Sequence, residues 1–131
     1  MSERSSNLQG DSLCNLEYLL VNLGRNQATA ERLIKLFLDN HLVLIRRMHE
    51  ALGAGDVPAL KDALHDIRSS CVLFSGHRCV DLAREFERVL CEVEDQGGEI
   101  DADWDSMATA LSQCMLCMAG ELTSYLDNKA S

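Results

Sequence analysis

The sequence predicts an all-α fold, an antiparallel up-and-down four-helix bundle with an additional short N-terminal helix. Apolar residues recur at helical spacing along almost the whole chain, and no alternating β-branched segments bounded by turns interrupt them. The chain has one proline, and 5% of its residues are aromatic. Short connections between long amphipathic helices favour antiparallel neighbours. With 131 residues, the chain is long enough for one such core and too short for two ordinary domains.

Glycines bound the first two predicted helices. A short helix is expected over about residues 12–23, with Asp11 or Ser12 as its cap and Gly24 as its stop. A second helix follows from about residue 27 to residue 52, where a Gly-Ala-Gly run ends it. One helical stripe of apolar residues supports this assignment: Ala30, Leu33, Phe37, Leu44, Met48 and Leu52.

The second helix carries more apolar residues than one stripe requires. The additional residues are Leu36, Leu38, Leu42, Val43 and Ile45. We interpret this excess as the mark of a central helix, covered by the short helix and by both neighbours. The alternative is an exposed patch that binds another protein, and both interpretations can hold along different parts of the helix.

The third predicted helix begins at Asp56, because an N-cap residue followed by Pro58 in the first turn is a typical helix start. It is expected to continue to Ser75, where Gly76 ends or bends it. A fourth helix is expected over about residues 78–96, before a Gly-Gly pair, and a fifth over about residues 103–126. The two apolar stripes that support them are Cys79, Ala83, Phe86 and Leu90, and Trp104, Met107, Leu111, Met115, Met118, Leu122 and Tyr125.

These bounds divide the chain into two parts. Residues 1–10 are expected to be a flexible N-terminal tail or a linker remnant, and residues 11–128 the four-helix-bundle domain. The N-terminal residues are polar, the longest apolar runs are far too short to cross a bilayer, and cytoplasm is therefore the default expectation. The net charge of −9 opposes binding to nucleic acid and to anionic membranes. A protein partner is expected instead.

The six cysteines do not predict a disulfide framework. Five of them, Cys71, Cys79, Cys91, Cys114 and Cys117, fall inside helical apolar patterns, so we expect reduced thiols that fill the core. Cys114 and Cys117 form a C-x-x-C pair without a second such pair, without a neighbouring histidine and without a strand-to-helix turn. No metal site and no redox site are expected.

The third helix presents a histidine on the side opposite its core stripe, which consists of Leu60, Leu64, Ile67, Cys71 and Phe74. At 100° per residue, His65 lies about 140° from the centre of that stripe and should face solvent. The same arithmetic places Lys61, Arg68 and Val72 within about 60° of His65. A phosphorylated imidazole would find countercharge from the two cations.

Residues 64–71, Leu-His-Asp-Ile-Arg-Ser-Ser-Cys, resemble the signature of the histidine-containing phosphotransfer (HPt) domain family. In that family, a histidine is followed by any residue, an aliphatic residue, a basic residue, a glycine and small residues. The segment before the active helix, residues 51–56, is also similar to the family. The chain departs from the pattern at Ser69 and Ser75, where the family has glycines. Gly76 comes one residue late, and Arg68 stands where lysine is commoner, which keeps the charge and changes its geometry.

The resemblance implies a phosphocarrier rather than an enzyme. His65 would accept and donate a phosphoryl group between receiver-domain aspartates of a two-component phosphorelay, with Arg68 and Lys61 as phosphoryl-supporting residues. The expected partners are response-regulator receiver domains. The chain is either a free-standing protein or the C-terminal domain of a hybrid sensor kinase, which would tether it at the inner membrane. It would carry no cofactor of its own, since the receiver supplies Mg²⁺.

The receiver would dock around His65. The residues expected to contact it are Ser69, Val72, Arg84, Glu87 and Arg88, although a charge run like the last three is more often a solvated helix face. The other histidines, His41, His49 and His77, lack the motif, and we interpret them as structural. The alternative function is an HPt-like docking module, which binds a receiver or a kinase domain and regulates it without phosphoryl transfer.

Overall fold

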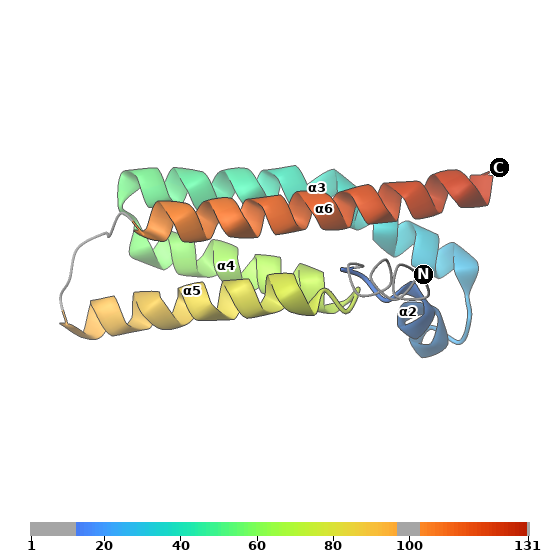
Figure 1. Ribbon diagram of the computed structural model, residues 1–131, viewed down its shortest axis with the longest axis horizontal. Helices are drawn as coiled ribbons and strands as arrows, with labels where there is room; N and C mark the ends of the chain where they lie inside the picture. Colours follow the sequence, from blue (N-terminus) through green and yellow to red (C-terminus); the bar gives the residue numbers. More distant parts are fainter. Residues whose placement is uncertain (1–12, 97–102, 131) are drawn as a thin grey trace, which may run out of the picture.

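The computed structural model of the protein describes residues 13–96 and 103–130. Within these residues the chain forms only helices. Four long ones pack as an antiparallel bundle in which each helix has two neighbours, as Figure 1 shows, and a short one lies across one end. In chain order they are α2 (Leu16–Asn22), α3 (Gln27–Ala54), α4 (Val57–Val72), α5 (His77–Gln96) and α6 (Asp103–Ala130). The predicted all-α bundle is confirmed.

The turn between α3 and α4 follows the capping residues in the sequence. Gly55 ends α3 in the left-handed conformation, with φ of 69°, which glycine adopts at little cost. The amide of Asp56 then donates to the Ala51 carbonyl at 3.0 Å. The Asp56 carboxylate accepts from the Ala59 amide at 3.1 Å and caps α4. This tight turn makes α3 and α4 antiparallel neighbours.

The short helix α2 begins later than predicted. Its N-cap is Asn15, whose side chain accepts from the Tyr18 amide, whereas residues 11 and 12 lie outside the described residues. The segment before α2 is tied to the bundle at two places. The Asn15 amide donates to the Phe74 carbonyl at 3.0 Å, and the Leu13 amide donates to the Glu121 carboxylate of α6 at 2.7 Å. Helix α2 therefore covers the end of the bundle and not its sides (Figure 1).

The corner between α4 and α5 is tighter than the sequence suggested. Helix α4 ends at Val72, three residues before the predicted Ser75, because the amides of Phe74 and Gly76 both donate to the Cys71 carbonyl. Ser75 has a φ of 59°, the left-handed conformation that favours glycine. A Cβ atom on Gly76 would lie 2.7 Å from the Met118 sulfur of α6. The left-handed backbone conformation at Ser75 and the close approach of Gly76 to Met118 thus fall on adjacent residues.

The predicted core stripes are buried with few exceptions. The four stripe residues within α4 and Phe74, which follows the helix, are at most 1% exposed, and this confirms the expected phase of α4. The prediction of a covered α3 is wrong for Leu36, Leu42 and Val43, which are 56%, 58% and 41% exposed. Because α2 lies across the end of the bundle, nothing in the described chain covers the outer face of α3.

The cysteines differ from the prediction of five reduced thiols that fill the core. Cys79 of α5 and Cys114 of α6 form a disulfide, with their Cα atoms 5.8 Å apart. Both lie on buried stripes of neighbouring helices, and single-helix periodicity cannot show that the two stripes meet at the same level. Cys71 is buried and free, while Cys91 and Cys117 are exposed and fill no core.

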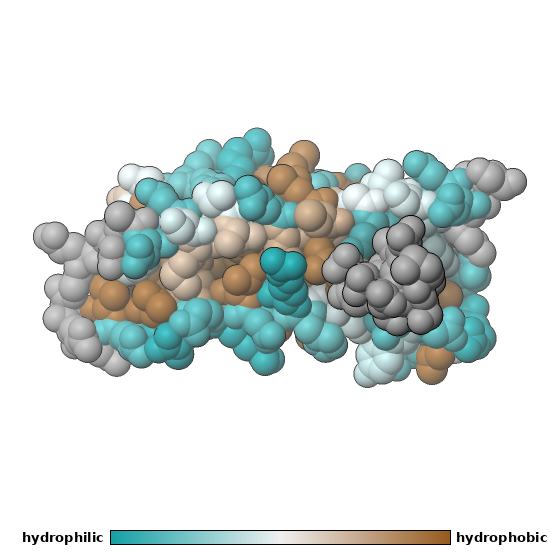
Figure 2. All heavy atoms as spheres, in the orientation of Figure 1, coloured by the Kyte–Doolittle hydropathy of each residue, from teal (hydrophilic) through white to brown (hydrophobic). Residues whose placement is uncertain are grey.

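Figure 2 shows the face formed by α5 and α6, where apolar atoms lie between two margins of hydrophilic side chains. This distribution is that of amphipathic helices packed in pairs. No helix within residues 13–96 and 103–130 is both long enough and apolar enough to cross a membrane.

Candidate functional site

His65 lies on the outer face of α4, as the helical arithmetic predicts. Its imidazole is exposed, whereas the neighbouring Leu64 and Ile67 side chains are fully buried in the bundle. The Asp56 cap and the continuous core stripe fix the rotation of α4, so the position of His65 is set by the packing of the helix. The exposed ring is accessible to another protein.

Arg68 contacts the imidazole from one turn further along α4. Its Nη2 atom donates a hydrogen bond to Nδ1 of His65 at 3.1 Å. A guanidinium has donors and no acceptor, so Nδ1 must act as the acceptor. In a neutral imidazole with this contact, the ring proton is therefore on Nε2.

The same guanidinium reaches across to α5. Arg68 Nε lies 3.0 Å from Oε2 of Glu87, and Arg68 Nη2 donates a long hydrogen bond to Oε1 at 3.4 Å. The shorter approach is close enough for an ion pair, yet both of its atoms are buried without a hydrogen-bond partner. We regard it as an ion pair in which the N–H does not point at the oxygen. Arg68 thus links His65 to α5 through an imperfectly aligned carboxylate.

The other flank of His65 faces α3. Asp66 forms an ion pair with Arg47 of α3 at 2.9 Å, with side chains that are 48% and 40% exposed. A pair this exposed contributes little stability. Next to it lies a shallow hollow between α3 and α4, lined by Asn40, Val43, Leu44, Arg47, Asp66, Ser69 and Ser70. This side of the site combines small hydroxyl side chains with apolar ones.

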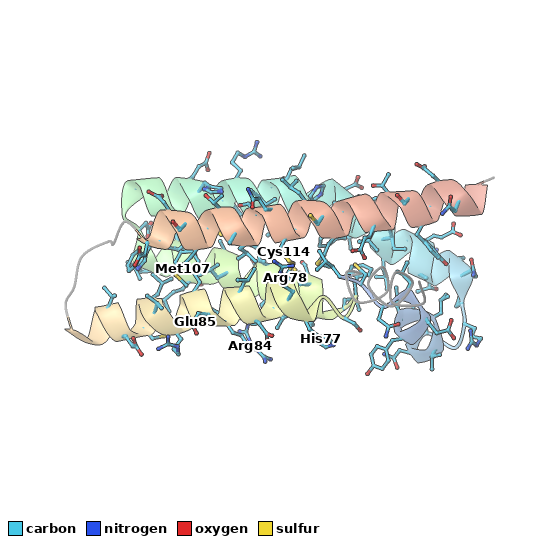
Figure 3. The ribbon with its side chains drawn as sticks, viewed as in Figure 1. His77, Arg78, Arg84, Glu85, Met107 and Cys114 are labelled. Atoms are coloured by element: carbon cyan, nitrogen blue, oxygen red, sulfur yellow. A yellow bond between two sulfur atoms is a disulfide. The ribbon has the colours of Figure 1, made fainter. Side chains whose placement is uncertain are left out.

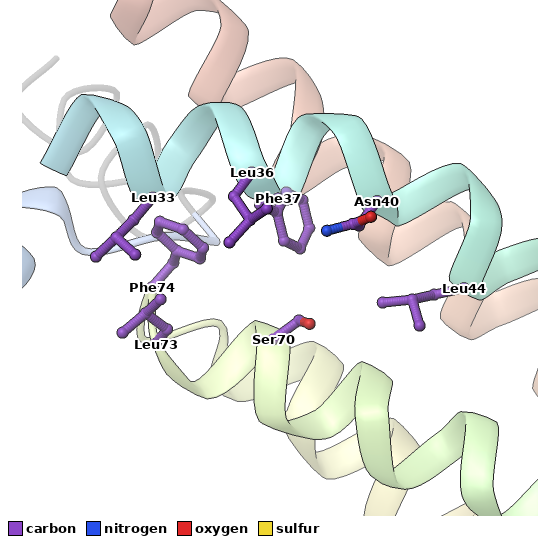
Figure 4. Close-up of a pocket in the computed structure, with 8 residues that line it drawn as sticks. All are labelled: Leu33, Leu36, Phe37, Asn40, Leu44, Ser70, Leu73 and Phe74. Atoms are coloured by element: carbon purple, nitrogen blue, oxygen red, sulfur yellow. The ribbon is translucent and has the colours of Figure 1, made fainter. Parts of the chain in front are cut away.

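A smaller apolar pocket continues from this hollow toward the end of α4. It has a volume of about 100 Å³, and Asn40, Leu44 and Ser70 line both depressions. Figure 4 shows side chains from α3 and from the end of α4 facing each other across it. The remaining lining residues are Leu33, Leu36, Phe37, Leu73 and Phe74. The α3–α4 groove therefore runs from a largely polar hollow beside His65 to an apolar pocket near the end of α4.

The other predicted site residues have different surroundings. Lys61 is half-buried, while Ser69 and Val72 are exposed on the same side of α4 as His65. Arg84 is exposed on the outer side of α5, as Figure 3 shows. Arg88 forms ion pairs with Glu85 and Glu92 of its own helix, and its hydrogen bond lowers the pKa of Glu85 below the ordinary value. Of the three charged residues predicted on α5, Glu87 is the one joined to His65 through Arg68.

Two of the other three histidines, His41 and His49, make contacts within the bundle, whereas His77 is exposed. His41 is buried, and its Nδ1 donates to the Leu38 carbonyl at 2.8 Å. His49 donates from Nε2 to the Ser112 hydroxyl of α6 at 2.8 Å, since that hydroxyl itself donates to a backbone carbonyl. His77 is the first residue of α5.

Sequence reasoning missed the Arg47–Asp66 pair and the apolar pocket. The signal for both was the α3–α4 turn, because residues equidistant from the turn of an antiparallel hairpin lie opposite each other. Arg47 and Asp66 stand almost symmetrically about Gly55 and Asp56. In the described part of the chain, no group of three or more histidine, cysteine or acidic residues could hold a metal ion.

Comparisons with known proteins bear on the family and the fold. A family model described as "Hpt domain" matches residues 32–128. A solved structure of the HPT domain from the Hpt sensor hybrid histidine kinase of Shewanella is similar, with a TM-score of 0.72 and 15% sequence identity. The match covers 89% of this chain and 96% of that one. The search of curated proteins gave no match.

Proposed function

This chain belongs to the Hpt domain family, and we propose that it accepts a phosphoryl group on His65 from one receiver-domain aspartate and donates it to another. Members of the family are phosphotransfer modules of two-component signalling, and they act as phosphocarriers rather than as enzymes in the usual sense. The proposal goes beyond the family in naming the residue that carries the phosphoryl group and the residues that support it.

The observation that carries the proposal is the exposed imidazole of His65 beside a cation. A phosphoryl group on the distal nitrogen, Nε2, would extend away from α4 into the space that a receiver can enter. Arg68 lies 3.1 Å from the other ring nitrogen, so a modest rotation of its side chain would bring donors to the phosphoryl oxygens. Lys61, one turn before His65, would add a second positive charge.

The proposed partner is a response-regulator receiver domain, either free or within a hybrid sensor kinase. It would dock on the exposed face of α4 around Ser69 and Val72 and on the charged side chains of α5, Arg84, Glu87 and Arg88. The apolar groove between α3 and α4 adjoins this face, and its continuity with the surroundings of His65 favours the same occupant. The receiver would bring the Mg²⁺ ion and the acidic pocket, in the cytoplasm.

The test is phosphoryl transfer from a phosphorylated receiver domain to the purified protein. Wild type should acquire an acid-labile, base-stable label, and His65→Gln should acquire none while keeping its helical circular dichroism. His77→Gln is the matched control, because His77 is also exposed and lies outside the motif. Labelling of His65→Gln at the wild-type level would disprove the assignment.

A second candidate function is docking without transfer, in which the bundle holds a receiver or a kinase domain and regulates it. The exposed apolar residues of the α3–α4 side, Leu36, Val43 and Leu73, favour this alternative, since a patch of this kind is typical of a protein-binding surface. Stable binding of unphosphorylated and phosphorylated receivers with no label on His65 would support it.

A further inference from the structure

We propose that Arg68 and Glu87 act as a latch that controls which ring nitrogen of His65 carries the proton. In the latched state Arg68 holds Nδ1 and is only partly paired with Glu87, and in the released state Arg68 leaves Nδ1 and completes its pair with Glu87. The proposal rests on phosphoryl transfer at His65, and it assigns to Glu87 the part of a positioning residue that acts through Arg68.

The structure holds the latched state. Arg68 Nη2 donates to Nδ1 at 3.1 Å, so the neutral imidazole presents an N–H at Nε2 and no lone pair. Nucleophilic attack by Nε2 needs the opposite tautomer, with the proton on Nδ1 and a free lone pair on Nε2. A guanidinium directed at Nδ1 opposes this tautomer, because two donors would then face each other.

The group-transfer step balances when the latch is released. The Nε2 lone pair forms a bond to the phosphorus of the aspartyl phosphate, and the bond between phosphorus and the aspartyl oxygen breaks. The carboxylate leaves with that electron pair, and the single ring proton stays on Nδ1. The ring then bears a positive charge that offsets one phosphoryl charge, and the Arg68 N–H groups that do not face Glu87 can donate to the phosphoryl oxygens.

The surroundings of Arg68 indicate where it goes on release. Arg68 Nε and Glu87 Oε2 are buried and lack hydrogen-bond partners, although they lie only 3.0 Å apart. A buried ion pair without an aligned hydrogen bond leaves a donor and an acceptor unsatisfied, and a small rotation of the guanidinium would align the bidentate pair that arginine and carboxylate prefer. That rotation would satisfy both buried atoms and withdraw Nη2 from Nδ1. The contact with His65 therefore coexists with a pairing to Glu87 that is formed but poorly aligned, and full alignment of that pairing would end it.

The tautomer can be measured without any phosphoryl transfer. In protein labelled with ¹⁵N-histidine at about pH 8.5, where an ordinary imidazole is neutral, the two ring nitrogens of His65 report which one is protonated. His65→Gln assigns the signals. We expect Nε2–H in wild type, a larger Nδ1–H population in Arg68→Met, and no such increase in Glu87→Gln. A wild-type ring with its proton mainly on Nδ1, or an Arg68→Met spectrum identical to wild type, would overturn the proposal.

A kinetic double-mutant cycle tests the part assigned to Glu87. Glu87→Gln should slow acceptance of the phosphoryl group on the order of tenfold, because the neutral amide holds the released guanidinium less strongly. In an Arg68→Met background, the same substitution should change the rate by less than about twofold. An equal slowing in both backgrounds would show that Glu87 does not act through Arg68, and would overturn the latch.

Glu85→Gln is the matched control for this cycle. Glu85 lies on the same helix and pairs with Arg88, so its substitution should change neither the tautomer nor the rate. The two proposals fail separately. If wild type accepts no phosphoryl group but its tautomer responds to Arg68→Met as expected, the proposed function fails and the latch on the ring proton stands.

Discussion

Replacement of Gly76 by alanine should destabilise the protein, although most exchanges of glycine for alanine in compatible backbone do the opposite. The new Cβ would lie 2.7 Å from the sulfur and 2.9 Å from the terminal methyl of Met118, and 3.1 Å from the Cys71 carbonyl oxygen. Met118 is fully buried, so its side chain has no solvent-filled space to enter.

The magnitude follows from two opposing effects. Overpacking of a dense core costs about 1 to 3 kcal/mol. The smaller conformational freedom of the unfolded alanine chain offsets about 0.4 to 1 kcal/mol of this. We therefore expect the free energy of unfolding to fall by about 1 to 2 kcal/mol. Urea titration followed by circular dichroism measures it, with the same m-value expected for both proteins.

Gly53 and Gly120 provide matched controls, because a Cβ on either would meet no atom within 4 Å. Both lie inside helices, so Gly53→Ala and Gly120→Ala should each stabilise the protein by about 0.5 to 1 kcal/mol. Gly76→Ala should also lower the free energy of unfolding by less in a Met118→Ala background, where the clash is absent. If Gly76→Ala instead stabilises the protein as the controls do, the close approach of the α4–α5 corner to α6 is refuted.

Three further outcomes can be checked on the same protein. Ile67→Ala should lower the free energy of unfolding by about 2 to 5 kcal/mol, since Ile67 is fully buried, whereas His65→Gln should change it by less than about 0.5 kcal/mol; equal effects would mean that α4 is rotated. Reduction of the Cys79–Cys114 disulfide should lower it by about 3 to 4 kcal/mol, the chain-entropy value for a separation of 35 residues; identical urea midpoints with and without reductant would contradict this. Burial raises the pKa of the Cys71 thiol to about 12, from 9.0 in the unfolded chain, so the unfolded state loses this proton first and stability should fall between these pH values. Cys71→Ala should reduce the slope of stability against pH there by up to about 1.4 kcal/mol per pH unit, and an unchanged slope would contradict the pKa.

The helices and the phase of α4 could be predicted from the sequence because both depend on local information. Capping by Asp56, the left-handed Gly55 and a stripe of apolar residues each act within one or two turns of helix. Together they fixed the outward orientation of His65 and placed Arg68 beside it.

The rest depends on how separate helices meet. The disulfide requires the level of α5 relative to α6, and the link from Arg68 to Glu87 requires the level of α4 relative to α5, neither of which a one-helix pattern contains. The exposure of Leu36 likewise depends on where α2 packs. The positive φ of Ser75 was unexpected because serine rarely adopts it; the glycine that the family has at this position would fit that backbone without strain.

The two flanks of His65 are chemically unlike, and this has a consequence for the order of events in a relay. Toward α5 the ring contacts the guanidinium of Arg68, and toward α3 the neighbouring features are the Arg47–Asp66 ion pair and the hollow between α3 and α4. Under the proposed function, any receiver must present its aspartate from the same direction and cover the same groove. The receiver that donates the phosphoryl group and the receiver that accepts it therefore compete for one binding surface and bind it in turn. Each must leave before the next arrives, so rapid dissociation matters more for signal flow than tight binding.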